Sequence, residues 1–438
     1  MSEKKITLSI KYLKFFGGLV FFTFLVFLVF AINEGRSAAQ ASENTDHFLS
    51  VMASPTPFLP GGELDVFPFE DVIETAASPT PRPTVVYEDG QYPTAIPLAL
   101  PTLSNITPYS LPEGINPLTG KAPMLPEFLD RRPVASKITL YPRSARPQSA
   151  LTMADVVFEY YIEGGLTRFI AVFYGTNPTQ IGPVRSGRFF DEHIMHMYQS
   201  YLVFKFADPR VLDYLKATDV SEFLALPTIA SCPPYFVGKE DRDTYNNIYF
   251  DLTRFGACLE KKELDNSRPT LRAGYFSGSP PAFAEEALRI FTYYSVDDYH
   301  YWGYEPLNQR YYRQQEITDT RDGKLPSYAP LIDMLTGQQV SADNIVFLFV
   351  PHSFTDQFQE EDEVYHIDPI GSGKAYLFRD GVVLPAYWRR IAIDQPLLIT
   401  DLNGMPLSLK PGRTFYEVLK EDSTATQDEV QWYFQFEP

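Results

Sequence analysis

The feature that most constrains this chain is an uncharged apolar run at residues 15–32. At about 1.5 Å per residue, a helix of this length spans roughly 27 Å, close to the roughly 30 Å hydrocarbon core of a bilayer. Lysines on its N-terminal side favour a cytoplasmic N-terminus; they are Lys4, Lys5, Lys11 and Lys14. We therefore expect a cytoplasmic tail at residues 1–14, a single-pass transmembrane helix at residues 15–32, and an extracytoplasmic location for the rest of the chain at the cell membrane.

The alternative interpretation of this run is a cleaved signal peptide, for which Ala39-Gln40-Ala41 offers a cleavage site of small residues. The run is longer than the apolar core of a usual signal peptide, which favours a retained anchor. No cysteine follows the run closely, so a conventional diacylated lipoprotein is not expected.

A stretch rich in Pro, Thr, Ser and Ala follows, in which Ser54-Pro55-Thr56-Pro57 recurs as Ser78-Pro79-Thr80-Pro81. It lacks apolar periodicity, so it cannot bury enough surface to offset the entropy of an ordered chain. We expect residues 33–115 to form a disordered linker that spaces a folded region from the membrane.

Charge and composition restrict the partners of the chain. The formal net charge is −18, whereas the phosphates of nucleic acids require a basic surface, so no nucleic-acid partner is expected. The length of 438 residues leaves room for two domains after the linker. Cys232 and Cys258 are the two cysteines, and outside the membrane we expect them to form a disulfide; two buried free thiols are the alternative.

The first expected domain, residues 116–297, mixes strands with helices. Residues 155–163 and 166–174 are β-branched and aromatic, and Gly164-Gly165 between them is typical of a tight hairpin. Periodicity and capping residues predict helices at residues 189–201, 209–215, 251–264 and 281–294. Together these elements predict an α+β domain.

The second expected domain, residues 298–438, is smaller and β-rich, and is interpreted as a small barrel or sandwich. Asp380-Gly381 and Asn403-Gly404 predict hairpins, the second one joining strands at residues 397–400 and 406–409, and residues 414–419 predict the last strand. Aromatic residues in these strands could form either a sugar-stacking platform or simple core; they are Trp302, Tyr304, Tyr387 and Trp388.

Spaced motifs over residues 116–420 resemble, in the same order, those of the YerB-like family of exported bacterial proteins, which are built around a domain of unknown function. They are Asn116-Pro117-Leu118-Thr119-Gly120, Arg132-Pro133-Val134-Ala135, Ala145-Arg146-Pro147-Gln148-Ser149, Ala154-Asp155-Val156-Val157-Phe158-Glu159, Glu163-Gly164-Gly165-Leu166-Thr167-Arg168 and Gly182-Pro183-Val184-Arg185-Ser186-Gly187-Arg188. The resemblance implies a two-domain, membrane-attached envelope protein and no established reaction.

The chain departs from this family at two points. Members are often lipoproteins, whereas this chain carries an apolar helix that looks uncleaved. The family also often has a His-Asn pair where this chain has Asn246-Asn247, which questions any role that needs that histidine.

The motifs concentrate arginines in an otherwise acidic chain. Arginine forks suit phosphate and carboxylate groups, and the start of a helix adds free amide groups that favour anions. We therefore predict an anion site for a phosphorylated or carboxylated envelope molecule, made of Arg146, Arg168, Arg185, Ser186 and Arg188. The alternative is a structural network in which the arginines pair with acidic residues, among them Asp155, Glu159 and Glu163.

The order of Ala154-Asp155, an apolar strand and Pro183-Val184-Arg185-Ser186 faintly resembles the LytR–CpsA–Psr phosphotransferases, which attach polymers from lipid carriers to the cell wall. Those enzymes place an aspartate where this chain has Ser186. That resemblance implies an enzyme that acts on polyprenyl-phosphate precursors and needs Mg²⁺, with the acidic residues as weak candidates for metal ligands.

We expect a non-catalytic binding or partner protein of the cell envelope, linked to cell-wall synthesis, because the sequence spells out no complete catalytic site. Its expected partners are the membrane, through the N-terminal helix, and cell-wall material or wall-synthesis proteins, with no cofactor. The phosphotransferase is the alternative. His193-x-x-His196 could place two imidazoles on one helix face, but no third ligand is indicated, so no metal site is expected.

Overall fold

A mixed sheet of 11 strands forms the centre of the part of the chain that the computed structural model describes, residues 111–272, 274–282, 284–354 and 365–437. The strand order is β19-β18-β17-β14-β20-β2-β3-β1-β4-β5, and β8 pairs with β18. The strands are β1 (Val134–Thr139), β2 (Val156–Tyr161), β3 (Thr167–Phe173), β4 (Tyr201–Val203), β5 (Leu224–Ala225), β8 (Glu285–Glu286), β14 (Asn344–Val350), β17 (Gly371–Arg379), β18 (Val382–Arg390), β19 (Leu398–Thr400) and β20 (Thr414–Lys420).

A second sheet, of seven strands within the described residues, has the order β12-β11-β10-β9-β22-β21, with β13 paired to β11. Its strands are β9 (Arg289–Ser295), β10 (Asp298–Glu305), β11 (Arg310–Glu316), β12 (Tyr328–Pro330), β13 (Ser341–Ala342), β21 (Thr424–Asp428) and β22 (Gln431–Gln435). Two small antiparallel pairs complete the strands: β6 (Tyr235–Val237) with β7 (Ile248–Phe250), and β15 (His352–Phe354) with β16 (Tyr365–Ile367).

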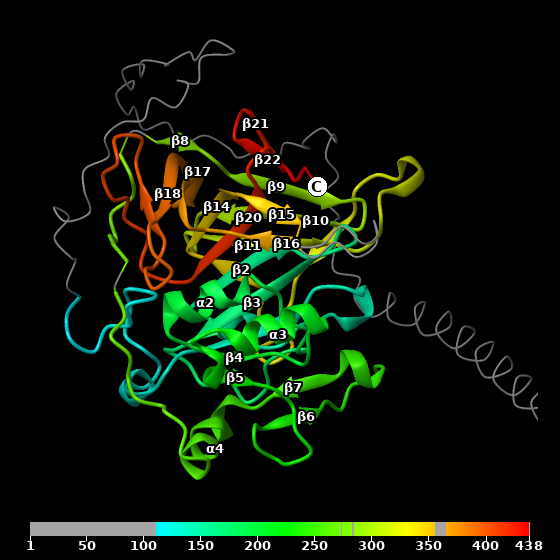
Figure 1. The fold of residues 1–438 in the computed structure, drawn as a ribbon. Helices are drawn as coiled ribbons and strands as arrows, with labels where there is room; N and C mark the ends of the chain where they lie inside the picture. Colours follow the sequence, from blue (N-terminus) through cyan, green and yellow to red (C-terminus); the bar gives the residue numbers. More distant parts are fainter. Residues whose placement is uncertain (1–110, 273, 283, 355–364, 438) are drawn as a thin grey trace, which may run out of the picture. The chain divides into compact units, whose positions relative to one another are not determined.

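The α-helices of the described residues are few and short: α2 (Asp191–Tyr198), α3 (Pro209–Ala217) and α4 (Phe255–Lys261). Helices α2 and α3 lie over the centre of the large sheet, and the second sheet packs on the opposite face (Figure 1). Phe190, the residue before α2, contacts Phe158 of β2 on the first face, whereas Trp302 of β10 contacts Phe415 of β20 on the second. The described residues are therefore mostly sheet, in three layers.

Strand β20 joins the two halves of the chain in one sheet. It lies between β2 and β14 and runs parallel to both, with Val156 opposite Thr414. The expected domain boundary, between residues 297 and 298, falls at the turn between β9 and β10. Strands from the second half thus contribute both to the large sheet and to the second sheet, instead of forming a separate barrel or sandwich.

Two of the three predicted tight hairpins are confirmed, those at Gly164-Gly165 and Asp380-Gly381. Gly164 and Gly165 have φ of +64° and +76°, and they join β2 to its antiparallel neighbour β3. Asp380 and Gly381 have φ of +56° and +76° between β17 and β18. Left-handed backbone at both turn positions matches the twist of the flanking strands, which is why these dipeptides identify hairpins.

The helix predicted at residues 281–294 is wrong, because this segment forms β8 and most of β9. Burial alternates along β9, with Ile290, Thr292 and Tyr294 facing the core. Residues four apart share a side in a strand as well as in a helix, so Ile290 and Tyr294 fit either period. The β-branched and aromatic residues of this segment favour the strand.

Two predictions near the C-terminus are also wrong. Residues 406–409 form isolated bridges, Thr400 to Pro406 and Phe276 to Leu409, instead of a strand. Strand β20 is followed by β21 and β22, so it is not the last strand. Trp432 and Phe434 of β22 fill space between the sheets, where Phe434 stacks on Phe347 at a ring distance of 3.7 Å.

An ion triad at the centre of the molecule links the two sheets. Glu159 of β2 and Glu417 of β20 stand directly opposite each other on neighbouring strands, and both side chains are fully buried. The guanidinium of Arg313, from β11 of the second sheet, lies 2.6 Å from Oε2 of Glu159 and 3.1 Å from Oε1 of Glu417. The single cation thus offsets the repulsion of two carboxylates that would otherwise destabilise the pair of strands.

Neighbouring polar groups complete this triad. Nε1 of Trp302 donates a hydrogen bond to Oε1 of Glu417 at 2.9 Å, and Nε2 of His300 lies 3.1 Å from the same oxygen. Burial raises the pKa of Glu417, an effect that Arg313 opposes. The same Arg313 forms charge-assisted bonds to both glutamates, so its removal would leave two carboxylates buried without a cation.

A disulfide joins Cys232 to Cys258 in α4, with the two Cα atoms 5.5 Å apart. It ties the segment before β6 to the helix that follows β7. In the chain-entropy account, closing a loop of this length lowers the entropy of the unfolded chain and so stabilises the folded state by about 3–4 kcal/mol.

The expected cytoplasmic tail, transmembrane helix and nearly all of the linker fall in residues 1–110, which lie outside the described residues. In the described part of the chain, none of the helices combines the length and the hydrophobicity that crossing a bilayer requires.

A second buried contact fixes α2 against the large sheet. His193 of α2 accepts a hydrogen bond at Nδ1 from Nη1 of Arg390 in β18, at 3.0 Å. Burial, and then the charge of Arg390, lower the pKa of His193 to about 3. The imidazole is therefore neutral in the folded protein at pH values where it would be protonated in the unfolded chain.

We predict that Arg313→Met lowers the free energy of unfolding by about 3–5 kcal/mol, because it leaves Glu159 and Glu417 buried without their cation. Urea unfolding of the full chain in mild detergent measures this loss. The matched control is Lys324→Met, which removes an exposed lysine that pairs with Asp319, and it should change stability far less. Equal losses in the two variants would contradict a central role for the triad.

We predict that His193 makes the folded protein sensitive to acid. Its pKa is lower in the folded than in the unfolded state, so its contribution is fully present above pH 6.5 and is lost as the pH falls toward 3. His193→Gln cannot take up that proton, so its free energy of unfolding should fall less steeply than that of the wild type between pH 6.5 and 4. Parallel pH profiles of the two proteins would refute this assignment.

Candidate functional site

Five cations meet at one end of the large sheet, beside the start of α2; we call them the cation cluster, and they are Lys137, Arg168, Arg185, Arg188 and Lys205. Antiparallel pairing of β1 with β3 brings Lys137 and Arg168 to the same face. The segment before α2 then runs beside β1, because the amide of Arg185 donates to the carbonyl of Lys137 at 3.1 Å. The amide of Lys205 donates to the carbonyl of Arg185 at 3.0 Å, which places the last member.

Glu163 neutralises part of this cluster. Nε of Arg188 donates to Oε2 of Glu163 at 3.0 Å, and its Nη2 bonds Oε1 of the same carboxylate. Nη2 of Arg168 lies 3.8 Å from Glu163, and its Nη1 donates to the carbonyl of Ser186 at 3.2 Å. One carboxylate thus serves two arginines, so this part of the predicted site is also a structural network.

Arg185 and Lys205 have no such partner. Arg185 is only 5% exposed; its Nη2 bonds Oδ1 of Asn246, and its Nε is buried without a hydrogen-bond partner. The guanidinium lies 4.1 Å from the ring centre of Tyr245, and Nζ of Lys205 lies 4.0 Å from the same ring. Two positive groups thus share one aromatic ring. The carboxylate of Asp243 is close enough to oppose the lowering of both pKa values by burial, but neither cation forms an ion pair with a carboxylate of the described residues.

Burial and neighbouring positive charges lower the pKa values of several members of the cluster. Burial, and then the charge of Arg188, lower the pKa of Arg168 to about 10. Burial and the charge of Arg185 lower the pKa of Lys205. Burial also lowers the pKa of Arg185. An anion bound among these groups would offset both effects, because an opposite charge stabilises the protonated form.

Lys137 forms the floor of the cluster. Its side chain is fully buried, lies 3.2 Å from Oδ1 of Asp191 and also bonds the hydroxyl of Tyr160. Burial lowers the pKa of Lys137 to about 7, although Asp191 raises it. Asp191 in turn accepts a hydrogen bond from the amide of Arg188 at 2.8 Å, so the floor fixes the backbone that carries Arg188.

The other predicted site residues lie elsewhere. Arg146 pairs with Glu316 of β11, away from the cluster. Asp155 accepts hydrogen bonds from the amides of Tyr174 and Gly175, a structural role at the far end of β3. Glu159 points to the opposite face of the sheet, toward Arg313. The structure thus brings together Arg168, Arg185, Ser186, Arg188 and Glu163, and separates them from Arg146, Asp155 and Glu159.

Sequence reasoning missed three members of this site: Lys205, Tyr245 and Asn246. Nothing in the local sequence marks Lys205, which follows a three-residue strand. Asn246 carried a signal, because Asn246-Asn247 replaces the His-Asn pair of the family. Its Nδ2 donates a hydrogen bond to Oδ2 of Asp243 at 2.6 Å, and its Oδ1 accepts one from Arg185. Asn246 therefore links the arginine to Asp243 through two hydrogen bonds.

The sugar-stacking platform is not formed. Trp302 and Trp388 are fully buried, and Nε1 of Trp388 donates to the carbonyl of Phe349 at 2.7 Å. Of the remaining two, Tyr304 packs on Tyr311 and Tyr387 is 39% exposed. Alternation along the strands places the two indoles in the core, as the competing interpretation expected.

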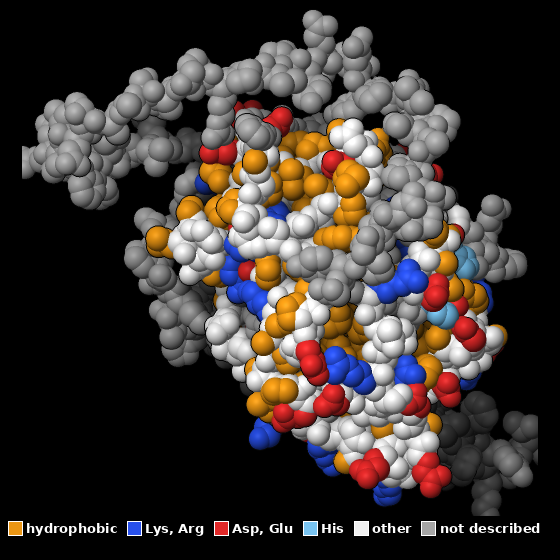
Figure 2. Space-filling view, turned by 90° about the vertical axis from the view of Figure 1, so that its left-hand side faces the viewer, with side chains coloured by type: hydrophobic (Ala, Val, Ile, Leu, Met, Phe, Trp, Pro, Cys, Tyr) orange, Lys and Arg blue, Asp and Glu red, His pale blue; other side chains and the backbone are white. Residues whose placement is uncertain are grey.

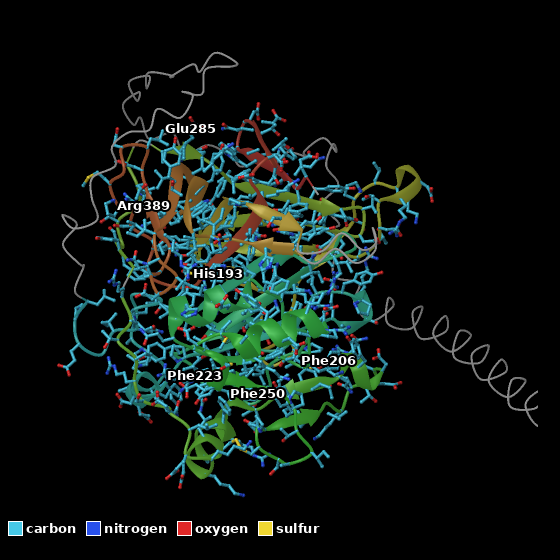
Figure 3. All side chains as sticks on the ribbon, in the orientation of Figure 1. His193, Phe206, Phe223, Phe250, Glu285 and Arg389 are labelled. Atoms are coloured by element: carbon cyan, nitrogen blue, oxygen red, sulfur yellow. A yellow bond between two sulfur atoms is a disulfide. The ribbon has the colours of Figure 1, made fainter. Side chains whose placement is uncertain are left out.

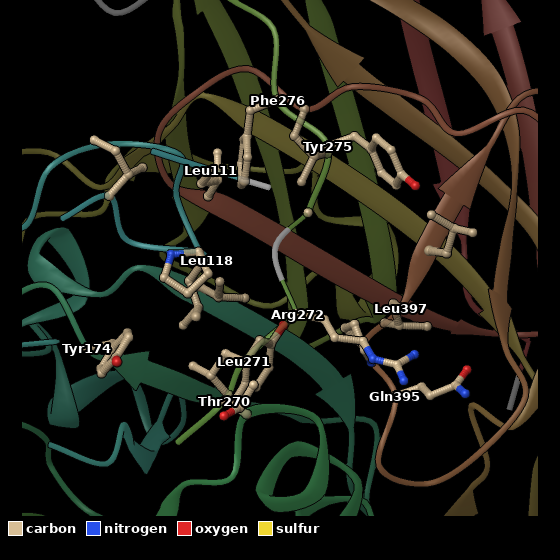
Figure 4. Close-up of a pocket in the computed structure, with 18 of the residues that line it drawn as sticks. Leu111, Leu118, Tyr174, Thr270, Leu271, Arg272, Tyr275, Phe276, Gln395 and Leu397 are labelled. Carbon is tan, nitrogen blue, oxygen red and sulfur yellow. The ribbon is translucent and has the colours of Figure 1, made fainter. Parts of the chain in front are cut away.

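A cleft of about 990 Å³ lies apart from the cation cluster. Leucines surround it, among them Leu111, Leu118, Leu271 and Leu397 (Figure 4). Figure 2 shows this face, on the left in Figure 1, where hydrophobic side chains gather near Lys and Arg side chains. In Figure 3, Arg389 beside the cleft and Phe206 beside the cluster lie on opposite sides of the view.

Three arginines line this cleft among its apolar side chains: Arg268, Arg272 and Arg389. Arg268 lies 3.5 Å from Asp130, whereas Arg272 forms no ion pair within the described part of the chain. The cleft therefore combines apolar walls with positive charge, which suits an elongated molecule with an anionic group.

Comparison with known proteins shows which family has this architecture. Residues 118–265 match the profile described as "Protein of unknown function (DUF3048) N-terminal domain", and residues 290–416 match the corresponding C-terminal domain. The chain is 27% identical over 306 residues to "Putative lipoprotein YerB" of Bacillus subtilis (strain 168), which covers 68% of this chain and 84% of the relative. The crystal structure of YerB from Bacillus subtilis has the same fold, with a TM-score of 0.58 and 24% identity over 70% of this chain and 97% of that one. The chain belongs to the YerB-like family, whose two DUF3048 domains it carries in order.

Proposed function

We propose that this chain is a membrane-attached, exported protein that binds an anionic molecule of the cell envelope through the cation cluster. The name of the Bacillus subtilis relative, a lipoprotein, supports attachment to a membrane. The apolar run at residues 15–32 supplies an anchor of another kind.

One observation carries the binding proposal: Arg185 and Lys205 lie against the same Tyr245 ring, and neither has a carboxylate partner among the described residues. Nε of the buried Arg185 lacks a hydrogen-bond partner as well. A phosphate or carboxylate group would accept that hydrogen bond and neutralise both cations. The ligand class is therefore a phosphorylated or carboxylated envelope molecule, such as a cell-wall precursor.

The arrangement favours binding over catalysis. A phosphotransferase needs free carboxylates that hold Mg²⁺ beside the arginines. Of the acidic candidates, Asp155 and Glu159 point elsewhere, and Glu163 is bonded to Arg188. Within the described residues, none of these three carboxylates is thus both near the cluster and uncommitted, which supports the non-catalytic role in the envelope over the phosphotransferase.

We predict that the full chain in mild detergent binds polyprenyl phosphate in calorimetric titrations, and that Lys205→Ala weakens binding at least tenfold. A charged hydrogen-bond partner contributes about 1.5–3 kcal/mol, and the effect should decrease with added salt. Arg185→Ala should weaken binding further, with its melting temperature checked because the residue is buried. The control is the exposed Arg254→Ala, which should bind normally. Unchanged affinity in Lys205→Ala and Arg185→Ala would exclude the cluster.

The cleft is a second candidate site for the same class of ligand, because Arg272 lies among apolar walls without an ion pair in the described region. In the same titrations, Arg272→Ala and Leu271→Glu would weaken binding of polyprenyl phosphate if its apolar chain occupies the cleft. Inorganic pyrophosphate separates the two sites, since it lacks an apolar chain and its binding should depend on Lys205 and Arg185 but not on Arg272 or Leu271. If neither Arg272→Ala nor Leu271→Glu changes the binding of either probe, the cleft has no role in binding this ligand.

A further inference from the structure

Three side chains converge beside α2 at a point that the proposed anion site does not use. Glu192 and His196 stand one turn apart on α2, and Asp219 follows the end of α3. Nε2 of His196 lies 3.2 Å from Oδ1 of Asp219 and 3.7 Å from Oε1 of Glu192. The ligand atoms of all three residues lie within 4.8 Å of one another.

These separations fit the ligands of one zinc ion. Zinc binds nitrogen and oxygen at about 2.0–2.2 Å in a tetrahedron, which places neighbouring ligand atoms roughly 3.3–3.6 Å apart. The distances from His196 to Asp219 and to Glu192 lie close to that range. One imidazole and two carboxylates supply nitrogen and oxygen atoms of the kinds that zinc binds, with one position left for water.

An independent observation points to a ligand at this place. Nε2 of His196 is buried and has no hydrogen-bond partner, and the side chain is only 10% exposed. Its nearest polar atoms are carboxylate oxygens of Asp219 and Glu192, but it forms no hydrogen bond of good geometry with either. A cation held between the ring nitrogen and the two carboxylates would satisfy all three groups.

The surroundings hold the first carboxylate in place. The hydroxyl of Tyr214, on α3, donates a hydrogen bond to Oε2 of Glu192, which leaves Oε1 directed toward His196. Such outer contacts orient metal ligands and are part of their affinity. His193, three residues before His196, bonds Arg390 instead, so the two histidines do not share a site.

A second cluster of this kind among the described residues, Glu159, His300 and Glu417, already contains a cation. The guanidinium of Arg313 lies between the two glutamates there. Glu192, His196 and Asp219 have no lysine or arginine among their ion-pair partners in the described structure, and so leave room for a metal ion.

We propose that Glu192, His196 and Asp219 bind one Zn²⁺ ion, which ties the end of α3 to α2. The sequence alone indicates no third ligand for His193 and His196 and led us to expect no metal site, because Asp219 stands after the next helix. Binding of Zn²⁺ to the folded state raises the melting temperature by mass action.

The test is a titration of the full chain, purified in mild detergent without a histidine tag and freed of metal with a chelator, with ZnCl₂ by calorimetry and thermal unfolding. The wild type should bind one Zn²⁺ per chain and melt at a higher temperature with Zn²⁺ than with Mg²⁺. Asp219→Asn should weaken Zn²⁺ binding at least tenfold, and because Asp219 is 81% exposed this variant should fold normally. His196→Gln should lose binding.

The matched control is Asp213→Asn, which removes an exposed carboxylate on α3 and should bind Zn²⁺ like the wild type. Tyr214→Phe should weaken binding without abolishing it, since it frees the second oxygen of Glu192 but keeps all three ligands. A wild type that shows no Zn²⁺-dependent shift would overturn the proposal. So would equal Zn²⁺ affinities in Asp219→Asn and Asp213→Asn.

Discussion

The ion triad of Glu159, Arg313 and Glu417 is the interaction on which the rest of the structure depends. The two glutamates stand opposite each other on parallel strands that come from the two halves of the sequence, and the arginine reaches them from the second sheet. Two buried carboxylates at this distance repel, so the sheet can close there only with the cation in place. The triad therefore fixes the register of β20 against β2 and the position of the second sheet together.

Strand β2 separates the core from the candidate site. Side chains alternate along β2, so Glu159 points toward the triad while its neighbour Tyr160 points toward Lys137 and Asp191. The floor of the cation cluster is thus one residue away from the centre of the core. A shift of one residue in β2 would exchange the two, which makes the geometry of the site inseparable from the pairing of the sheet.

Local sequence patterns predicted the elements that depend on residues close together in the chain. The hairpin at Gly164-Gly165, the first-domain strands and the helix after Asp208 follow from turn chemistry, β-branched runs and capping, and all three are present. The arginines before α2 were also identified, since their sign stands out in an acidic chain. The family resemblance, carried by the order of spaced motifs, is confirmed by the matches to both DUF3048 domains.

What could not be predicted depends on contacts between distant residues. Nothing near Glu417 indicates that it faces Glu159, and nothing near Arg313 indicates that it lies between them. Lys205 and Asp219 likewise reach their partners, Tyr245 and His196, only when α2 and its neighbours are packed. The local signal was ambiguous at residues 281–294, where the same residues fit both the period of a helix and the period of a strand. The burial of alternate residues favours the strand.

The position of β20 has a consequence for how this protein reaches its folded state. Strands β2 and β14 are buried along their whole length, on the two sides of a strand that leaves the ribosome after both of them. Until residues 414–420 are made, each of the two hydrophobic strands has an open edge that can pair with other chains. A chain cut short before β20 would therefore be a target for degradation and not a shorter functional form.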